Sequence, residues 1–498
     1  MHLPMTPRHL HLQLGSRDGA PRWTGEVKAT FGTRLPEAPR TPENGIFAEW
    51  RWDGKRLAVR GDRYGLFPLY YYARNNEFAI SNSIAKLLDL GAPVALDDAA
   101  LAVFVRLGQF VGDDTPFAAV RAIPPGAQLT WEDAMLQVSS RYLQPRRSAI
   151  SGREALDGYI TLFREAVERC ADAAGESVLP LTGGRDSRHI LFELLRCAHQ
   201  PRTCVTAAYH SPYPNEDARI AQLVTRALDL PHIVLHPRRD LMRAELEKND
   251  RIGCCSFEHS FALPLAEYVN GSDCAVFDGI GGDVLSAGLY LEERRHRLLV
   301  DGRWDELCSE LALNEESLEL LNTRFRRRLS VERYRERLKR ELQRHASAVN
   351  PFTSFIFWSR TRRNIALVPF CLYQPARVYA PYLDNGVFDF LASLPPEMFY
   401  DKSFHTRAIE RAFPAHSDLP YELKMVRGQQ RTAQFRWLGL QLAAYLFEHR
   451  PFEFLNPGFV SIRVVNMLLN PAFRPDQAWW FRKVAYFLSL ERMLRRAT

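Results

Sequence analysis

The sequence predicts a mixed α/β protein in two parts, on three observations. About the first 145 residues hold short runs of alternating apolar and polar side chains between turn residues, a pattern typical of antiparallel strands. Beyond residue 178, apolar runs alternate with helical patterns, which indicates a parallel sheet, and from Leu289 onward the pattern is largely helical. A linker rich in Pro, Arg and Ser at residues 144–148 separates the parts, so we predict domains of residues 1–147 and 148–498.

Local patterns predict the individual elements. In the first part, strands are expected at residues 46–52, 56–60 and 77–81, followed by a helix at 97–108. Asp53-Gly54 and Asn75-Asn76 supply turns between these strands. The second part begins with a helix at 153–173, continues with strands at 178–181, 203–208 and 231–235 and a helix from 215, and has a later helix at 406–413.

Composition narrows the class of protein. A hydrophobic fraction of 46% and a charged fraction of 25% over 498 residues are typical of a globular chain with a sizeable core. No apolar run reaches the ~18 residues of a membrane span, and the start of the chain lacks the apolar region of a signal peptide. We therefore expect no membrane segment and a cytoplasmic location. The eight cysteines include no CxxC pair, which predicts reduced structural thiols and no zinc site.

One stretch has the character of an anion-binding loop. The strand that ends at Leu181 runs into Thr182-Gly183-Gly184-Arg185-Asp186-Ser187, and a helical pattern follows from Ile190. At such a strand–turn–helix junction, free backbone N–H groups and the positive end of the helix dipole point at one place. The glycines allow close approach of a phosphate, the Thr and Ser hydroxyls add donors, and the Asp carboxylate suits a phosphate-bound Mg²⁺. No Lys follows the glycines, so this is not a GxxxxGK[ST] loop.

A second strand runs into a glycine turn at residues 274–283, where Gly279, Ile280, Gly281 and Gly282 precede Asp283. The carboxyl ends of parallel strands meet at one edge of a sheet, where ligands bind. Asp186 and Asp283, on different loops, could therefore hold Mg²⁺ against a triphosphate.

The net charge of +7 is unevenly distributed, because ten basic residues crowd positions 324–344. Glu332, Glu336 and Glu341 are interleaved at helical spacing, which favours a solvated helix with internal salt bridges. A face that binds a polyanion is the alternative, and the sparse aromatic residues make nucleic-acid binding the weaker interpretation.

These motifs together resemble the asparagine synthetase superfamily. The TGGRDS loop is similar to the SGGxDS loop of enzymes that split ATP between the α- and β-phosphates, with Thr keeping the hydroxyl of the first Ser. DRYGLFPLYY at residues 62–71 resembles the DRxGxxPLYY segment of the amidotransferase domain, and RVYAPYLD at 377–384 resembles RVPFLD. DGIGGD at 278–283 is similar to the segment that carries GEGAD in the family. The resemblance covers the whole front third and continues through both loops.

The resemblance implies an Ntn-hydrolase-like domain at 1–147 and a PP-loop ATP-pyrophosphatase domain with a helical extension at 148–498. It implies ATP and Mg²⁺ as cofactors, with Asp186 and Asp283 as metal ligands and catalytic residues. The implied nucleotide-binding residues are Leu181, Thr182, Gly183, Gly184, Asp186, Ser187, Val205, Gly279 and Gly281. A basic residue after the "LP" of this family contacts the phosphates, and here Lys424 and Arg427 compete for that role, with Arg427 favoured.

Two departures from the family bear on function. Glutamine-using members carry the nucleophilic Cys at position 2, where this sequence has His2, and no cysteine occurs before Cys170. We therefore expect no glutaminase half-reaction, as in the β-lactam synthetases and lasso-peptide cyclases that this chain resembles. The family's acidic residue of GEGAD falls on Ile280, which can move no proton.

We accordingly expect a ligase that adenylates a small-molecule or peptide carboxylate, releases pyrophosphate, and joins the acyl group to an amine. Peptide cyclisation is the most attractive specific case. Three alternatives stay open: an ammonia-dependent asparagine synthetase, a PP-loop enzyme that modifies RNA, and an inactive binding protein. Either a homo-oligomer or a partner protein that processes a precursor is compatible with the sequence.

Overall fold

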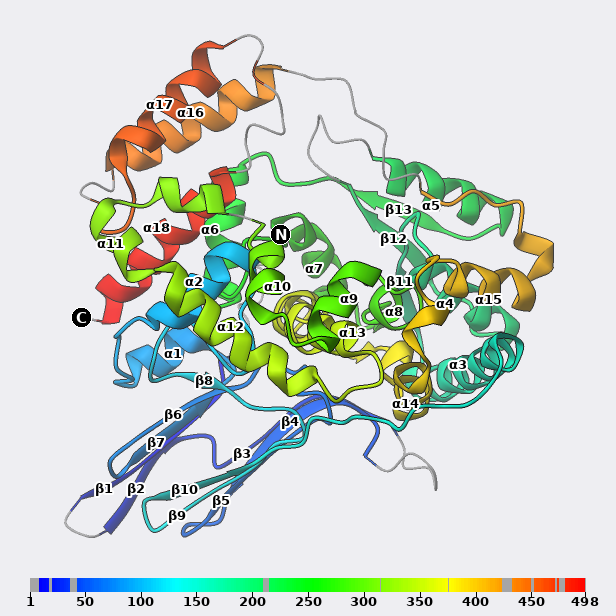
Figure 1. Ribbon diagram of the computed structural model, residues 1–498, viewed down its shortest axis with the longest axis horizontal. Coiled ribbons are helices and arrows are strands. Elements are labelled where there is room, and N and C mark those ends of the chain that lie inside the picture. The colour runs from blue at the N-terminus through cyan, green and yellow to red at the C-terminus, as the bar shows by residue number, and fades with distance from the viewer. Residues whose placement is uncertain are drawn as a thin grey trace.

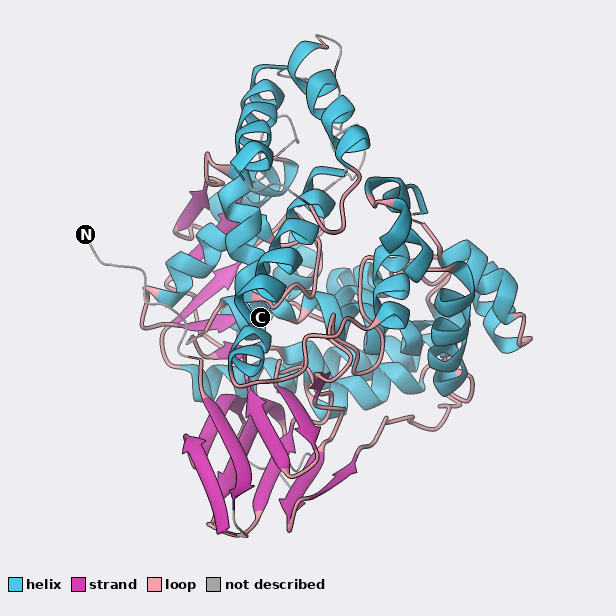
Figure 2. Ribbon diagram, turned by 90° about the vertical axis from the view of Figure 1, so that its left-hand side faces the viewer, coloured by secondary structure: helices cyan, strands magenta, loops and turns pink. Residues whose placement is uncertain are grey.

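The first part of the chain consists of two antiparallel sheets. The computed structural model describes residues 9–17, 20–35, 43–208, 215–313, 315–374, 376–422, 432–448, 452–470, 473 and 480–497. One sheet has the order β2 (Ala20–Gly25), β1 (His11–Arg17), β7 (Glu77–Ser81), β6 (Tyr70–Arg74) and β8 (Arg121–Ala122). The other has the order β10 (Met135–Ser139), β9 (Gln128–Glu132), β5 (Leu57–Gly61), β4 (Gly45–Trp52) and β3 (Lys28–Arg34). Figure 2 shows both sheets at one end of the molecule, and the three predicted strands are among them.

Aromatic side chains fill the space between the two sheets. The ring centroid of Phe78 on β7 lies 5.4 Å from that of Trp131 on β9, and Phe31 on β3 stacks on Phe67 at 5.2 Å. Helices α1 (Ile84–Asp89) and α2 (Asp98–Leu107) follow the strands. The carboxylate of Asp97 accepts the N–H of Ala100 and caps α2, which is why this helix begins where the sequence predicts.

The second part is organised around a five-stranded parallel sheet. Its order is β13 (His232–Leu235), β12 (Thr203–Ala207), β11 (Ser177–Pro180), β14 (Ala275–Phe277) and β15 (Val378–Tyr379). Helix α3 (Gly152–Ala174) precedes β11, α4 (Asp186–Arg196) and α5 (Glu216–Ala227) each connect two strands, and α7 (Leu263–Asn270) leads into β14. The predicted parallel sheet is confirmed, and β15 is an addition that local pattern did not reveal.

From Leu289 onward the chain is largely helical, as predicted, and helices α6 (Leu241–Arg251) and α8 (Gly282–Leu285) lie before that point. The described α-helices after Leu289 are α9 (Glu293–Val300), α10 (Trp304–Leu311), α11 (Thr323–Arg328), α12 (Val331–His345), α13 (Pro351–Ile356), α14 (Asn385–Ser393), α15 (Phe404–Ala412), α16 (Thr432–Glu448), α17 (Pro457–Leu469) and α18 (Trp480–Ala497). Residues 357–365 continue α13 as a π-helix. In Figure 1, α16 and α17 form a hairpin far from the two antiparallel sheets. Among the described residues, none of the helices has the length and apolarity that crossing a bilayer requires.

A buried arginine joins the two parts. Arg362, on the π-helix, donates to the carbonyl oxygens of Gly65 (3.1 Å), Gly112 (3.0 Å) and Ile123 (2.7 Å), and to the carboxylate of Asp113 (2.7 Å). Its side chain is fully buried. A Cβ atom at Gly65 would lie 3.1 Å from the Arg362 Nε atom, so only glycine admits this approach without displacing the guanidinium. The motif at residues 62–71 therefore helps to hold the two parts together.

The basic segment also faces the first part. Arg328 binds the carboxylate of Asp98 through two nitrogens, and Arg337 lies between Asp114 (2.7 Å) and Glu341 (3.2 Å). These pairs favour the salt-bridged interpretation of α11 and α12. The salt bridges are not confined to the two helices, because Asp98 and Asp114 belong to the first part of the chain.

The eight cysteines are all free, and six of them are fully buried. Burial raises the pKa of every thiol for which a shift is resolved, to about 12 for Cys204 and Cys371. Structural thiols were predicted, and thiols held in the protonated form fit that role.

Candidate active site

The predicted phosphate loop connects β11 to α4 and is closed by its own side chains. The Thr182 N–H donates to the Ser187 hydroxyl at 3.1 Å, and the Gly184 N–H donates to the Thr182 hydroxyl at 3.1 Å. The Gly183 N–H donates to the Asp217 carboxylate at 2.7 Å. This bond shows that a loop N–H can donate to an anionic oxygen, as phosphate binding requires.

Leu181 and Val205 act through their backbones. The Leu181 N–H donates to the Val205 carbonyl at 2.9 Å, and both side chains are fully buried. This pair holds the phosphate loop against the neighbouring strand β12. Any contact of these two residues with a nucleotide would therefore be made by main-chain atoms.

The second glycine turn lies directly against the first loop. The Asp283 N–H donates to the Asp186 carboxylate at 3.1 Å, so the structure brings the two predicted aspartates together from positions 97 apart in the chain. A Cβ atom on Gly279 would lie 2.9 Å from the Asp186 Cβ atom, and one on Gly282 would lie 2.7 Å from its carboxyl carbon. The close approach of the two loops therefore requires these glycines. Gly281, the N-cap residue of α8, lies in the left-handed region at φ 88°.

Two buried residues without a role predicted from sequence, His405 and Tyr382, contact Asp186, and a third, His189, contacts His405. The His405 Nδ1 atom lies 3.3 Å from the Asp186 carboxylate, and the Tyr382 hydroxyl donates to the Asp186 carbonyl at 3.2 Å. On its other side, His405 Nε2 lies 3.2 Å from the Tyr382 hydroxyl and 3.3 Å from His189 Nδ1. Burial lowers the pKa of His189 well below its usual value, so this imidazole is neutral at pH 7. Tyr382 lies in the segment at 377–384 that resembles RVPFLD, but only folding shows that Tyr382 and His405 approach Asp186.

Asp278 is a further carboxylate that the prediction missed. It follows β14 and accepts the N–H of Ile280 at 2.8 Å. Burial, aided by the negative charge of Asp186, raises the pKa of Asp278 to about 6. Its place at the carboxyl end of a strand was the available signal.

Replacing Asp278 by Asn should remove a pH-dependent loss of stability. The native pKa of about 6 lies above the ordinary 3.8, so the native state binds the extra proton, and the wild type loses stability as the pH rises from about 4 to about 6. We expect the free energy of unfolding of Asp278→Asn to exceed that of the wild type by about 1–3 kcal/mol at pH 8, and to differ little from it below pH 4. Urea denaturation at both pH values measures this. Asp172→Asn, at an exposed site, should show no such difference, and a variant without a pH-dependent gain would contradict the raised pKa.

The two predicted metal ligands fit a hard cation that also binds phosphate. Both offer carboxylate oxygens, the ligand type that Mg²⁺ prefers, and the Asp186 side chain remains 26% exposed. Over the described part of the chain, no three or more His, Cys, Asp or Glu side chains are grouped to hold a metal ion. A Mg²⁺ held by these residues would therefore need further oxygen ligands, as a nucleotide's phosphates supply.

Lys424 and Arg427 lie outside the described residues, so their role stays a prediction. The described chain before them ends beside the phosphate loop, where the Glu422 N–H donates to the Gly183 carbonyl at 3.0 Å. Arg188 fastens this segment to α4 by donating to the Leu419 carbonyl (2.9 Å) and the Pro420 carbonyl (2.6 Å).

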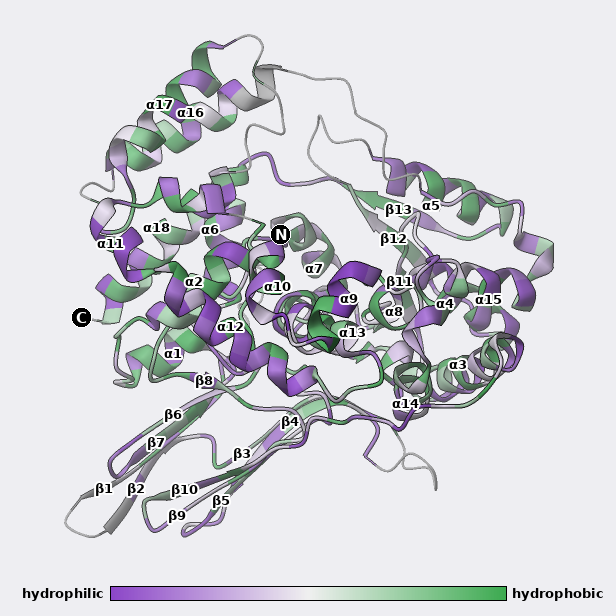
Figure 3. Cartoon of the chain, in the orientation of Figure 1, coloured by the Kyte–Doolittle hydropathy of each residue, from purple (hydrophilic) through white to green (hydrophobic). Residues whose placement is uncertain are grey.

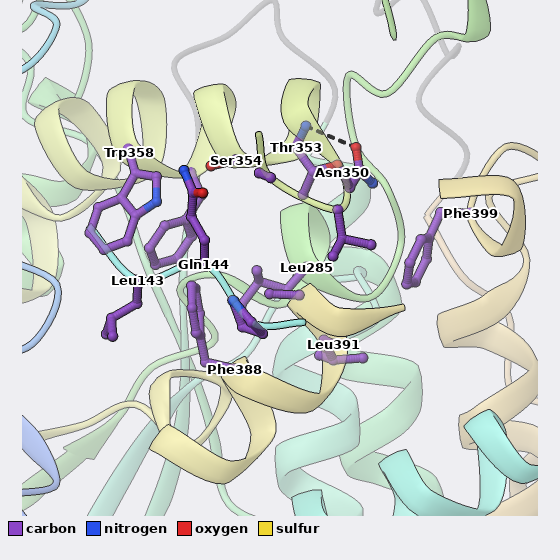
Figure 4. A pocket seen from close by; sticks show the side chains of 15 residues that line it. Leu143, Gln144, Leu285, Asn350, Thr353, Ser354, Trp358, Phe388, Leu391 and Phe399 are labelled. Atoms are coloured by element: carbon purple, nitrogen blue, oxygen red, sulfur yellow. Dashed lines mark hydrogen bonds between the residues drawn. The ribbon is translucent and has the colours of Figure 1, made fainter. Parts of the chain in front are cut away.

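An apolar pocket adjoins the C-terminal end of α8 (Figure 4). It encloses about 460 Å³, counting the space at its mouth, and Leu285, two residues after Asp283, forms part of its wall. Aromatic rings supply much of the lining: Phe357, Trp358, Phe388 and Phe399. The Thr353 hydroxyl has no hydrogen-bond partner there. Such a lining fits an apolar group and does not fit phosphates, so the two glycine loops stay the predicted site for a nucleotide.

Two protein families match this chain. Residues 37–143 match the family described as glutamine amidotransferase domain, and residues 159–364 match asparagine synthase. The two matches place the chain in the asparagine synthetase superfamily, as its motifs predicted. The match to the asparagine synthase family supports an ATP-dependent ligase of the kind that forms amide bonds. Both glycine loops lie inside the second match, whereas His405 lies beyond it.

The similar solved structures resemble this chain only weakly. Glutamine phosphoribosylpyrophosphate amidotransferase from B. subtilis, complexed with ADP and GMP, is 13% identical over 38% of this chain and 32% of its own, with a TM-score of 0.14. A structure of the allosteric regulatory enzyme of purine biosynthesis is 10% identical over 41% of this chain and 44% of its own, with a TM-score of 0.15. The chain thus spans less than half of either structure, and scores this low support no functional argument. No curated protein matches it.

Proposed function

We propose that the protein adenylates a substrate carboxylate with ATP, releases pyrophosphate, and transfers the acyl group to an amine without hydrolysing glutamine. The observation that carries the proposal is the junction of the two glycine loops, where the Asp283 N–H lies 3.1 Å from the Asp186 carboxylate beside a phosphate loop that lacks Lys. Cyclisation of a peptide is the specific case we favour, because the amine then comes from the substrate itself.

In this reaction some of the residues would bind the phosphates and others would stabilise the developing charge. The loop N–H groups and the hydroxyls of Thr182 and Ser187, which bond to one another and to Asp217 in this structure, would exchange these partners for the phosphates and orient them. Asp186 and Asp283 would hold Mg²⁺, which neutralises charge on the leaving pyrophosphate. A carboxylate oxygen forms a bond to the α-phosphorus while the bond to the β-phosphate oxygen breaks. The amine then attacks the acyl carbon, AMP leaves with the bonding electrons, and the amine loses a proton.

Analysis of the products made from ATP tests this proposal. Purified protein is incubated with MgATP and a panel of amino acids and short peptides as carboxylate donors, and nucleotides are separated by ion exchange. We expect AMP and pyrophosphate in equal amounts with an accepted donor. ADP and phosphate would reject the assignment of the loop, because they arise from cleavage at the γ-phosphate.

We also expect no glutaminase activity. The first cysteine of the sequence is Cys170, which is 1% exposed, and burial raises the pKa of its thiol far above the usual value. A buried, protonated thiol is a poor nucleophile. Glutamate release from glutamine, measured by a coupled dehydrogenase assay, should equal the rate without enzyme. A rate above that background would require a nucleophile of another kind.

A further inference from the structure

The hairpin of α16 and α17 has apolar side chains on opposite sides of each helix. One side is buried and consists of Leu438, Leu442, Leu446, Val460, Val464 and Met467. The other side is exposed: Trp437 by 57%, Leu440 by 53% and Phe447 by 80% on α16, and Ile462 by 71%, Val465 by 51% and Leu469 by 73% on α17. Spacings of three, four and seven residues place each exposed set on one stripe of its helix.

Such a hairpin is expected to be covered on both sides. Helices that are apolar all round are normally buried, and single chains rarely expose contiguous apolar patches larger than a few hundred Å². Figure 3 shows hydrophobic residues recurring along both helices. Among the described side chains of the two helices only Arg436, Glu448 and Arg463 are charged, and Arg463 lies over the Phe459 ring at 4.2 Å. Within the described chain, nothing covers the exposed stripes.

We propose that a second copy of this chain covers them, so that two hairpins form a four-helix bundle across a two-fold axis. A two-fold interface requires a surface that complements itself, and an apolar surface almost free of charge does so without matched ion pairs. Six large side chains that are at least half exposed offer an area on the order of the ~800 Å² that each partner gives to a standard interface.

The composition of the hairpin disfavours a membrane as the occupant. Helices that lie on a bilayer pair their apolar face with a strongly charged one that is rich in Lys and Arg. The face opposite the exposed stripe is here apolar and buried instead. The hairpin also lies beyond residue 364, outside both family matches, so the interface is an addition to the shared ligase domain.

Sedimentation velocity of the full-length protein tests the proposal, from ~0.1 to ~50 µM and without ATP. We expect the wild type to sediment as a dimer at the upper concentrations. Leu440→Glu with Ile462→Glu should weaken dimerisation at least ~100-fold, because two charges per chain would be buried in an apolar interface. Val465→Lys, a second and milder variant, should weaken it at least ~10-fold. Melting curves confirm that each variant is folded.

Leu313→Glu is the matched control, because Leu313 is 70% exposed and lies outside the hairpin. It should change the dimer dissociation constant less than ~2-fold. A wild type that stays monomeric at all concentrations overturns the proposal, as does a dimer that the hairpin variants leave unchanged. Sedimentation with vesicles of phosphatidylcholine and phosphatidylglycerol that the hairpin variants abolish would assign the surface to a membrane instead. None of these measurements depends on the proposed reaction.

Discussion

Asp186→Asn and Asp283→Asn should each reduce ATP–pyrophosphate exchange by at least ~100-fold while the chain stays folded. If both carboxylates hold Mg²⁺ on one pyrophosphate, the loss of either removes a preorganised charge where the leaving group becomes negative. The Asn side chain keeps an oxygen that can accept the Asp283 N–H, so the junction of the two loops should survive in the first variant. Exchange assays with an accepted carboxylate, together with melting curves, measure both effects.

The double variant separates a shared role from two independent ones. Because both residues act on a single charge, the exchange rate of the double variant should be little below that of the less active single variant. Without ligand, the variants should be no less stable than the wild type, since removing one of two neighbouring carboxylates relieves repulsion. Asp172→Asn, an exposed substitution of the same kind, should retain full exchange. A folded single variant with near wild-type exchange would show that its residue is not a metal ligand.

Arg362→Met should lower the free energy of unfolding by about 3–5 kcal/mol, the cost of breaking a buried network of charged hydrogen bonds. The substitution leaves the Gly65, Gly112 and Ile123 carbonyls without their arginine donor at the junction of the two parts. Urea denaturation followed by circular dichroism and by tryptophan fluorescence measures the loss. If the junction opens first, the two probes should report different midpoints.

Two further variants test whether the loss comes from the hydrogen bonds of the Arg362 guanidinium. Arg362→Lys keeps the charge but cannot reach three carbonyls with one ammonium group, so it should recover only part of the loss. Arg340→Met removes an exposed arginine whose side chain is 62% accessible and which pairs with Glu336 at 3.9 Å, and it should change stability by less than about 0.5 kcal/mol. Equal losses at positions 362 and 340 would show that Arg362 does not hold the two parts together.

The sequence indicated the phosphate loop because its signals are local. An apolar strand, adjacent glycines and a helical pattern lie within about 15 positions, and the hydrogen bonds that close the loop join neighbours such as Thr182 and Ser187. The prediction erred by four residues in the start of α4, which begins at Asp186 and not at Ile190. An aspartate in the first turn gains from the helix dipole, a bias that a count of apolar positions does not register.

The boundary between the parts and the roles of Lys424 and Arg427 stay predictions, because no observation bears on them. The same holds for the compartment, the oligomeric state and the chemistry of the substrate. A basic segment could be given two interpretations from sequence alone, and the carboxylates of Asp98 and Asp114 favour one of them only because folding brings them to α11 and α12.

The sequence by itself determined the two glycine loops, their aspartates and the positions of the central strands along the chain, because each depends on residues close in the chain. Only the tertiary structure decided what surrounds them. Tyr382 reaches the Asp186 carbonyl from 196 positions away, and Arg362 reaches Gly65 from 297 positions away. A buried donor pairs with the acceptor that tertiary packing brings within reach. Leaving the donor unpaired would cost more free energy than the hydrogen bond itself contributes to stability. Local pattern therefore shows which residues can do chemistry, and long-range packing decides which of them meet.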